Sequence, residues 1–252
     1  MRDGSGNIYG ATFAGGTYDC GTVFKLDAAG QESVLHSFSC GGADGTSPLA
    51  GLVRDGRGNL YGTTGSGGAS NHGTVFKVDD AGTETVLYSF RGGADGQAPV
   101  ARLVRDTVGN LYGTTASGGN HACQDGCGTV FKIHGHKKTT LYTFTGGADG
   151  GIPKADLVLD AAGRLYGTTS TGGNLDTVDC NYTGCGVVFE LAPGGKEKVL
   201  YTFSGQGDGK YPLAGLTFDP SQSLYGTTSS GGFLEKGCKS RGGCGVVFKI
   251  TP

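Results

Sequence analysis

Short hydrophobic segments recur along the whole chain and are separated by turns rich in Gly, Asp and Asn. A clear example is Asn-Leu-Tyr-Gly-Thr-Thr at residues 59–64, which is followed by Gly-Thr-Val-Phe-Lys at residues 73–77. Short segments with β-branched and aromatic side chains, bounded by turn residues, are typical of β-strands. The phrase occurs five times, and its Tyr-Gly half stands at Tyr9, Tyr61, Tyr112, Tyr166 and Tyr225. The pattern therefore predicts an all-β protein built from five similar repeats.

A full repeat contains four expected strands, which we call strands A to D. In the second repeat they cover residues 49–55, 59–64, 73–78 and 83–90. Four short strands in a repeat of about 40–50 residues are typical of a β-propeller blade. The strands are apolar on both faces, which favours blades that stack against one another. We therefore expect one β-propeller domain of four-stranded blades over residues 1–252.

The first and last repeats are incomplete. The repeat cores begin near residues 7, 59, 110, 164 and 223. The first repeat lacks most of strand A, and the last stops before strand D. These ends fit either a five-bladed ring with thin terminal blades or a fragment of a larger ring. Because open strand edges are a liability that propellers normally close, we favour the fragment.

The loop between strands B and C carries nearly all of the length variation. From the Tyr of strand B to the Phe of strand C the separation ranges from 15 to 23 residues, whereas from that Phe to the next Tyr it stays at 35 to 37. Variable loops on a constant scaffold are where binding residues usually lie. In a four-stranded blade this loop and the connection from strand D to the next strand A emerge at the same end. We expect the functional face there.

Each D–A connection contains an Asp, usually within Gly-Gly-Ala-Asp-Gly. A turn role, in which the carboxylate accepts nearby backbone N–H groups, is favoured over contact with a cation or ligand. Aromatic side chains of the B–C loops could stack on a sugar ring. The candidate ligand-binding residues are Asp44, Asp95, Asp149, Asp208, Tyr18, Tyr182 and Phe233. We expect no cofactor and assign no metal ligand or catalytic residue, while calcium stays open because these carboxylates could converge with backbone carbonyls.

The eight cysteines form local pairs, which favours disulfides over metal ligation. Zinc sites usually join C-x2-4-C pairs to a second pair of Cys or His, whereas here each close pair lies in a different repeat. Disulfides are typical of an oxidising compartment. The expected disulfides are Cys20–Cys40, Cys123–Cys127, Cys180–Cys185 and Cys238–Cys244.

Charge and composition exclude several classes of protein. The net charge of −2 and the absence of a strongly basic stretch argue against nucleic acid as a partner. No apolar run approaches the length of a membrane span. The 52 glycines recur at fixed places in the period, so they indicate turns of a folded protein. No nucleophile elbow, zinc-protease motif or phosphate-binding loop is present.

The phrase at residues 59–64 and 73–77 resembles the Gloeobacter/Verrucomicrobia (GloVer) tandem repeat of choice-of-anchor proteins. The resemblance covers the whole chain and implies a bacterial protein that is secreted or anchored at the cell surface. The strand order also looks like the NHL and YVTN style of blade. Those superfamilies include binding propellers and metal-dependent enzymes such as gluconolactonase-like lactonases, but no residue here matches their metal or catalytic positions.

These observations lead to a main and an alternative function. The main expectation is an extracellular or cell-surface propeller that is not an enzyme and binds a polysaccharide or a protein through the face of the B–C loops and D–A connections. The alternative is a carbohydrate-active hydrolase or lyase, or a calcium-dependent lactonase-like enzyme. An enzyme would need a cluster of unlike acidic and His side chains that the repeats do not display.

Overall fold

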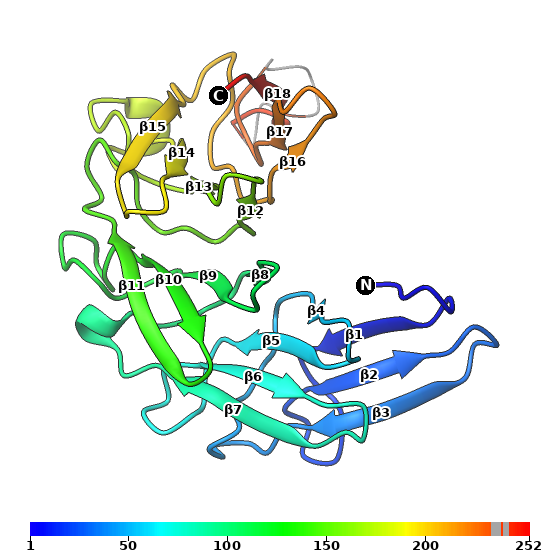
Figure 1. Cartoon of the computed structure of the whole chain (residues 1–252). Helices are drawn as coiled ribbons and strands as arrows, with labels where there is room; N and C mark the ends of the chain where they lie inside the picture. Colours follow the sequence, from blue (N-terminus) through cyan, green and yellow to red (C-terminus); the bar gives the residue numbers. More distant parts are fainter. Residues whose placement is uncertain (233–237, 239–241) are drawn as a thin grey trace. The chain divides into compact units, whose positions relative to one another are not determined.

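The computed structural model describes residues 1–232, 238 and 242–252, and its regular structure is almost entirely β (Figure 1). Within these residues the only helical segments are two short 3-10 turns, Gly93–Asp95 and Val178–Cys180. The strands form five antiparallel sheets, with the orders β1-β2-β3, β4-β5-β6-β7, β11-β10-β9-β8, β12-β13-β14-β15 and β16-β17-β18. The predicted all-β class is therefore confirmed, and the described strands form five three- or four-stranded sheets.

The strands follow the expected order A to D within each repeat. Their bounds are β1 Ile8–Thr12, β2 Thr22–Leu26, β3 Glu32–Ser37, β4 Val53–Arg54, β5 Leu60–Thr64, β6 Thr74–Val78, β7 Glu84–Ser89, β8 Val104–Arg105, β9 Leu111–Thr115, β10 Thr129–His134, β11 Lys137–Thr143, β12 Val158–Leu159, β13 Leu165–Thr169, β14 Val187–Leu191, β15 Glu197–Thr202, β16 Thr217–Phe218, β17 Leu224–Thr227 and β18 Val247–Ile250. The three middle sheets have four strands, and the first and last have three. Strand A of the first repeat is reduced to the bridge between Arg2 and Ile8.

The chain divides into two compact units. One contains residues 1–113 and 131–139, and the other contains residues 114–130 and 140–252. No described sheet closes on itself, so the propeller ring and the single domain stay predictions.

The sheets share one register, because they repeat one sequence phrase. In β5 and β6, Leu60 faces Val78 and Gly62 faces Phe76. In β13 and β14, Leu165 faces Leu191, so the same positions are paired. The pairing of strands C and D shifts by one residue at the Val-Phe step in the first, second and fourth sheets. A shift at a fixed place is a β-bulge that belongs to the repeat.

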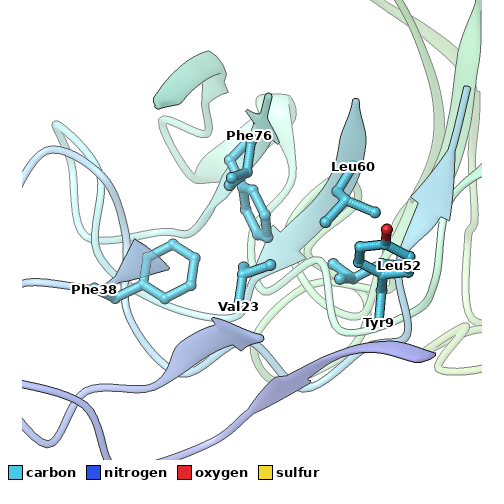
Figure 2. Packing of buried hydrophobic residues seen from close by; sticks show 7 residues of the cluster. Tyr9, Val23, Phe38, Leu52, Leu60 and Phe76 are labelled. Atoms are coloured by element: carbon cyan, nitrogen blue, oxygen red, sulfur yellow. The ribbon is translucent and has the colours of Figure 1, made fainter. Parts of the chain in front are cut away.

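One hydrophobic cluster of the first unit takes buried side chains from β1, β2, β5 and β6, together with Phe38 and Leu52, which lie outside the strands. Figure 2 shows Phe38, Val23 and Phe76 packed beside Leu60 and Leu52. The rings of Phe38 and Phe76 meet edge to face at 5.1 Å. The Phe before the D–A connection contacts the strand C Phe of the next repeat, and the same pairing recurs between Phe144 and Phe189. Aromatic pairs of this geometry join successive repeats.

The glycine in each Tyr-Gly phrase makes room for this ring. A Cβ at Gly62 would lie 2.5 Å from Cζ of Phe76 and 2.9 Å from Cδ2 of Leu52. No side chain fits there unless Phe76 or Leu52 moves. The glycine inside strand B is therefore a packing requirement of the core.

We expect Gly62→Ala to lower the free energy of unfolding by about 1–3 kcal/mol, because the added methyl group overpacks the core. Gly65→Ala is the matched control, since a Cβ at Gly65 would find its nearest neighbour at 3.5 Å. Urea denaturation of both variants measures the difference. Equal stabilities would show that the Phe76 ring can shift freely and would contradict the packing argument.

Burial on both faces holds for the two central strands and not for strand D. In β5 and β6, four of five residues are buried. In β7 every residue is half-buried, and β3 and β11 are more exposed. The prediction that strand D of the second repeat is covered on both faces was therefore wrong, apart from Phe90 at its end, which is fully buried. Strand D is the last strand of its sheet and has no partner strand on its outer side.

All four predicted disulfides are present, with Cα–Cα separations between 5.0 and 5.4 Å. They are typical of an oxidising, non-cytoplasmic compartment. In the second repeat, His72 stands at the position of Cys20, directly before strand C. A Cβ at Gly92 would lie 2.5 Å from Nε2 of His72, as one at Gly146 would lie 2.5 Å from Sγ of Cys123. The D–A connection thus packs on a disulfide or on the imidazole ring in its place.

No helix in the described part of the chain is both long and apolar enough to cross a membrane.

Candidate functional site

The D–A connections and the B–C loops lie together at one end of the sheets. The N–H of Gly68, in the B–C loop of the second repeat, donates to the carbonyl of Gly42 in the preceding D–A connection at 3.3 Å. Gly173 donates to Gly147 in the same way at 2.8 Å. In the first repeat the Cys20–Cys40 disulfide joins the B–C loop to the D–A connection. The described candidate ligand-binding residues therefore lie at this end of the sheets.

Each predicted Asp of this face closes its own turn. Asp95, for example, accepts the backbone N–H of Arg91 at 2.9 Å and the Tyr88 hydroxyl at 2.8 Å. Asp149 accepts the N–H of Thr145 and the hydroxyl of Tyr142. Asp208 accepts the N–H of Ser204 and the hydroxyl of Tyr201. These contacts match the turn role that the sequence favoured.

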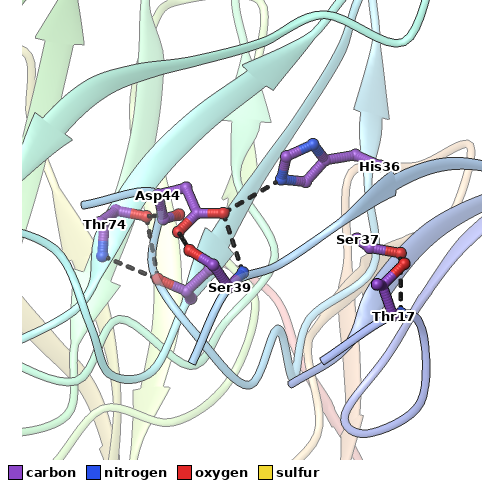
Figure 3. A network of polar contacts seen from close by, with 7 residues as sticks. Thr17, His36, Ser37, Ser39, Asp44 and Thr74 are labelled. Carbon is purple, nitrogen blue, oxygen red and sulfur yellow. Dashed lines mark hydrogen bonds and ion pairs between the residues drawn. The ribbon is translucent and has the colours of Figure 1, made fainter. Parts of the chain in front are cut away.

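Asp44 differs from the other three, because its side-chain partner on strand D is a histidine. Nε2 of His36 lies 3.3 Å from Oδ2 of Asp44 (Figure 3). The same carboxylate accepts the N–H of Ser39 at 3.0 Å and its hydroxyl at 2.7 Å. The side chains of His36 and Asp44 are 19% and 18% exposed, so water and small molecules can reach them. An imidazole held by a carboxylate is the arrangement in which His acts as a general base.

Glu84 approaches this pair from the next repeat. It is the first residue of β7, and the turn before it touches β3, since a Cβ at Gly82 would lie 2.6 Å from the carbonyl oxygen of Leu35. Burial, and secondly the charge of Asp44, raise the pKa of Glu84 to about 7. Its Oε1 is buried and has no hydrogen-bond partner. Glu84 is therefore protonated in about half of the molecules near pH 7.

The other repeats show how unusual this combination is. Asp95 meets a lysine at the position of Glu84, and Nζ of Lys138 lies 3.0 Å from its Oδ1. Asp149 faces Glu197, whose pKa is also raised to about 7, but the strand D partner there is Tyr142. Among the described residues, only the Asp44 position combines a histidine with a glutamic acid of raised pKa.

The two described loop aromatics, Tyr18 and Tyr182, are exposed side chains. Tyr18 is 57% exposed and Tyr182 is 65% exposed, and they belong to different compact units. Phe233 lies outside the described residues. The Cys20–Cys40 disulfide places the loop of Tyr18 close to the connection that carries Asp44. Stacking of these rings on a ligand stays a prediction.

Within the described residues, no group of three or more His, Cys, Asp or Glu side chains is placed to hold a metal ion. The four Asp carboxylates are occupied by N–H and O–H donors, as given above for each turn. Calcium binding stays an untested possibility.

The sequence analysis did not identify His36 or Glu84, although one signal could have identified His36. Aligning the strand D positions puts His36 level with Tyr88, Tyr142 and Tyr201, so it is the one departure in a column of tyrosines. Glu84 precedes Asp95 by 11 residues but faces Asp44, 40 residues earlier in the chain. That contact depends on how successive repeats pack and is not visible in a single repeat.

The raised pKa values predict a pH-dependent change in stability on replacing Glu84 or Glu197 with Gln. Below pH 4.5 each carboxyl is protonated in both folded and unfolded chains, so its pKa shift has no effect. Between pH 4.5 and 7 the unfolded chain loses the proton first. The resulting destabilisation of the folded chain reaches its full size above pH 7. Each shift corresponds to roughly 3 kcal/mol at full burial, and for these half-buried side chains we expect about 1–2 kcal/mol.

Each Gln variant should therefore be more stable than the parent at pH 8 and equal to it near pH 4. Urea denaturation at the two pH values measures this. A Gln variant that is less stable than the parent at pH 8 would mean that the carboxylate has partners that stabilise its charged form.

Comparison with known proteins gives a fold likeness and no family. No protein-family model and no curated protein matches the chain. Among solved structures, a luciferin-regenerating enzyme superposes with a TM-score of 0.52 and 12% identity, covering 97% of this chain and 78% of that one. A candidate 6-phosphogluconolactonase from Bacteroides uniformis gives 0.54 and 16%, covering 97% and 67%. PorZ, a surface component of the type-IX secretion system of Porphyromonas gingivalis, gives 0.54 and 16%, covering 92% of this chain and 31% of PorZ.

At these identities the likeness shows an all-β, propeller-like fold. It also corrects the main functional expectation. Two of the three similar structures are enzymes by name, which contradicts the interpretation as a non-catalytic binding module and favours the lactonase-like alternative. The expectation went wrong because it treated the four Asp positions as equivalent, whereas Asp44 has neighbours that the others lack.

Proposed function

We propose that the chain is a hydrolase of lactones, with His36, Asp44 and Glu84 as its active site. The observation that carries this proposal is the contact of His36 with Asp44 beside Glu84, whose pKa is raised to about 7. Lactone hydrolysis needs a base to activate water and an acid to protonate the leaving oxygen. A lactonase-like activity agrees with the B. uniformis structure, although that likeness by itself concerns only the fold.

We assign one role to each side chain. Asp44 orients the imidazole of His36 and stabilises the charge that it acquires. His36 removes a proton from a water molecule, whose oxygen attacks the lactone carbonyl carbon. When the tetrahedral intermediate collapses, the ring C–O bond breaks, and Glu84 donates its proton to the departing oxygen. The product is the open hydroxy acid, and proton transfer from His36 to solvent and from solvent to Glu84 restores the site.

The surrounding face suits a sugar-derived lactone. The loop of Tyr18 is tied to the Asp44 connection by the Cys20–Cys40 disulfide, which lowers the entropy lost when a ligand orders the loop. An exposed aromatic ring next to polar groups is a common platform for a sugar ring. We propose that the five sheets are blades of one β-propeller, that a carbohydrate lactone binds at this end of the sheets, and that the protein is secreted or lies at the cell surface.

The test is hydrolysis of a lactone panel by the oxidised full chain. Hydrolysis of glucono-δ-lactone and of a γ-lactone is measured by acid release, once with a chelator and once with added calcium. Each rate is compared with the rate of spontaneous hydrolysis. Saturable turnover in chelator supports the roles given above. Turnover only with calcium would overturn this metal-free mechanism, and rates equal to spontaneous hydrolysis under both conditions would overturn the function.

A further inference from the structure

A cavity lies beside the second sheet, at the end opposite to the Asp44 position. It has a volume of about 540 Å³ and opens beside the turn between β4 and β5. Its volume falls in the range of small-molecule sites, roughly 300–1,000 Å³. The lining residues are Asp55, Gly56, Arg57, Asn59, Tyr61, Lys77 and Arg105. All of them belong to the first compact unit.

The three cations of this cavity have no anionic partner. In the described part of the chain, no carboxylate lies within 4.0 Å of the charged groups of Arg57, Lys77 or Arg105. The guanidinium of Arg105 stacks over the Tyr61 ring at 6.0 Å, and its Nε is buried without a hydrogen-bond partner. A buried donor of this kind costs free energy unless a ligand satisfies it.

The one carboxylate of the cavity is fully occupied by neutral donors. Oδ1 of Asp55 accepts the N–H groups of Arg57 and Asn59 at 2.9 and 3.0 Å. Oδ2 accepts the Asn59 amide at 2.9 Å and the Tyr61 hydroxyl at 3.0 Å. Three positive charges against this single negative charge leave two positive charges around the cavity.

The combination of Arg57, Lys77 and Arg105 occurs only in the second repeat, although lysine recurs at the Lys77 position as Lys25, Lys132 and Lys249. In the fourth repeat Glu190 stands at the position of Lys77, and Phe218, which packs on Tyr166 as Arg105 packs on Tyr61, stands at that of Arg105. The cation of that repeat, Arg164, pairs with Asp160 at 2.6 Å and with Glu190 at 3.9 Å. The turn of the fourth repeat thus balances its charges with its own residues, whereas the turn of the second repeat does not.

We propose that this cavity binds a phosphate monoester of a small polar molecule of about hexose size. Such a group carries about two negative charges at neutral pH, which matches the charge of the cavity. Guanidinium groups recognise its oxygens in pairs. Arg57 and Arg105 hold the phosphate from two sides and Lys77 adds the third charge, while Asn59 lies beside the polar body of the ligand. The site is separate from the proposed lactonase centre and does not depend on it.

The test is isothermal titration of the oxidised full chain at low salt with glucose 6-phosphate, inorganic phosphate and glucose. We expect saturable 1:1 binding of glucose 6-phosphate, weaker binding of inorganic phosphate and none of glucose. Arg57→Val and Arg105→Leu copy the residues of other repeats, Val108 and Leu159, and so preserve the local fold. Each should raise the Kd by about tenfold or more, because a charged hydrogen-bonding partner is lost.

Lys132→Gln is the matched control, since Lys132 occupies the Lys77 position of the third repeat and does not line the cavity. Its Kd should equal that of the parent. The proposal is overturned if glucose 6-phosphate shows no saturable binding at millimolar concentration, if glucose binds equally well, or if Arg57→Val and Arg105→Leu leave the Kd unchanged while circular dichroism shows them folded.

Discussion

Glu84→Gln is expected to lower kcat/KM for lactone hydrolysis by about 10²–10⁴, the usual contribution of a general acid. Glutamine has nearly the shape of glutamic acid but cannot donate a proton to the departing ring oxygen. Because burial and the charge of Asp44 raise the pKa of Glu84 to about 7, kcat/KM of the parent should fall as the pH rises through about 7. Initial rates between pH 5 and 9, roughly the range around that value, measure both effects.

Glu197→Gln is the control for this variant. Glu197 has the same place on strand D and a pKa raised in the same way, but no histidine lies beside its partner Asp149. Its replacement should leave kcat/KM within about twofold of the parent, since it takes no part in the chemistry. Equal losses from Glu84→Gln and Glu197→Gln would point to a shared structural role and remove Glu84 from the active site.

His36→Tyr tests the base without disturbing the fold. Tyrosine occupies this place in the next three repeats and donates its hydroxyl to the Asp of the D–A connection, as Tyr88 does to Asp95. The variant should stay folded and lose activity to a similar degree as Glu84→Gln, because a phenol is a poor base near neutral pH. Full activity in His36→Tyr would exclude the proposed role of His36.

Phe189→Ala is expected to lower the free energy of unfolding by about 3–5 kcal/mol, as is usual for a buried Phe. The ring is fully buried in β14 and meets Phe144 edge to face at 5.1 Å. It also fills the space that Gly167 leaves open, since a Cβ there would lie 2.7 Å from its Cζ. Removing the ring therefore leaves a cavity, because Gly167 on the neighbouring strand has no side chain to fill it.

The matched substitution is Phe248→Ala in the last sheet. Phe248 makes the same edge-to-face contact with Phe203 at 5.1 Å, but it lies in a three-stranded sheet and is only half-buried. We expect Phe248→Ala to lower the free energy of unfolding by about 1–3 kcal/mol, because folding removes less apolar area from water at this site. Urea denaturation gives both values. If Phe189→Ala does not refold, Phe189→Leu should show a smaller loss of stability of the same kind. A loss of stability at Phe248 as large as at Phe189 would contradict the argument that the fourth strand increases the burial of this ring.

The strands, the five repeats and the disulfides followed from the sequence, because short-range patterns encode them. The Tyr-Gly and Val-Phe phrases lie on adjacent antiparallel strands, so the register between Gly62 and Phe76 follows from one loop. Three of the four disulfides join cysteines only four to six residues apart. Local hydrogen bonds of the Asp turns were equally predictable, since each Asp bonds a backbone N–H a few residues away.

Only the tertiary structure decided which charged side chain from the next repeat each Asp meets. Glu84 meets Asp44 across 40 residues, and Lys138 meets Asp95 across 43, because the start of strand D packs against the preceding repeat. Asp44 thus acquires a glutamic acid of raised pKa as its neighbour, while Asp95 acquires a lysine that neutralises it. Sequence periodicity determined the sheets because each sheet folds from neighbouring segments. The pairing of unlike side chains between sheets depends on packing, which the period of a repeat does not contain.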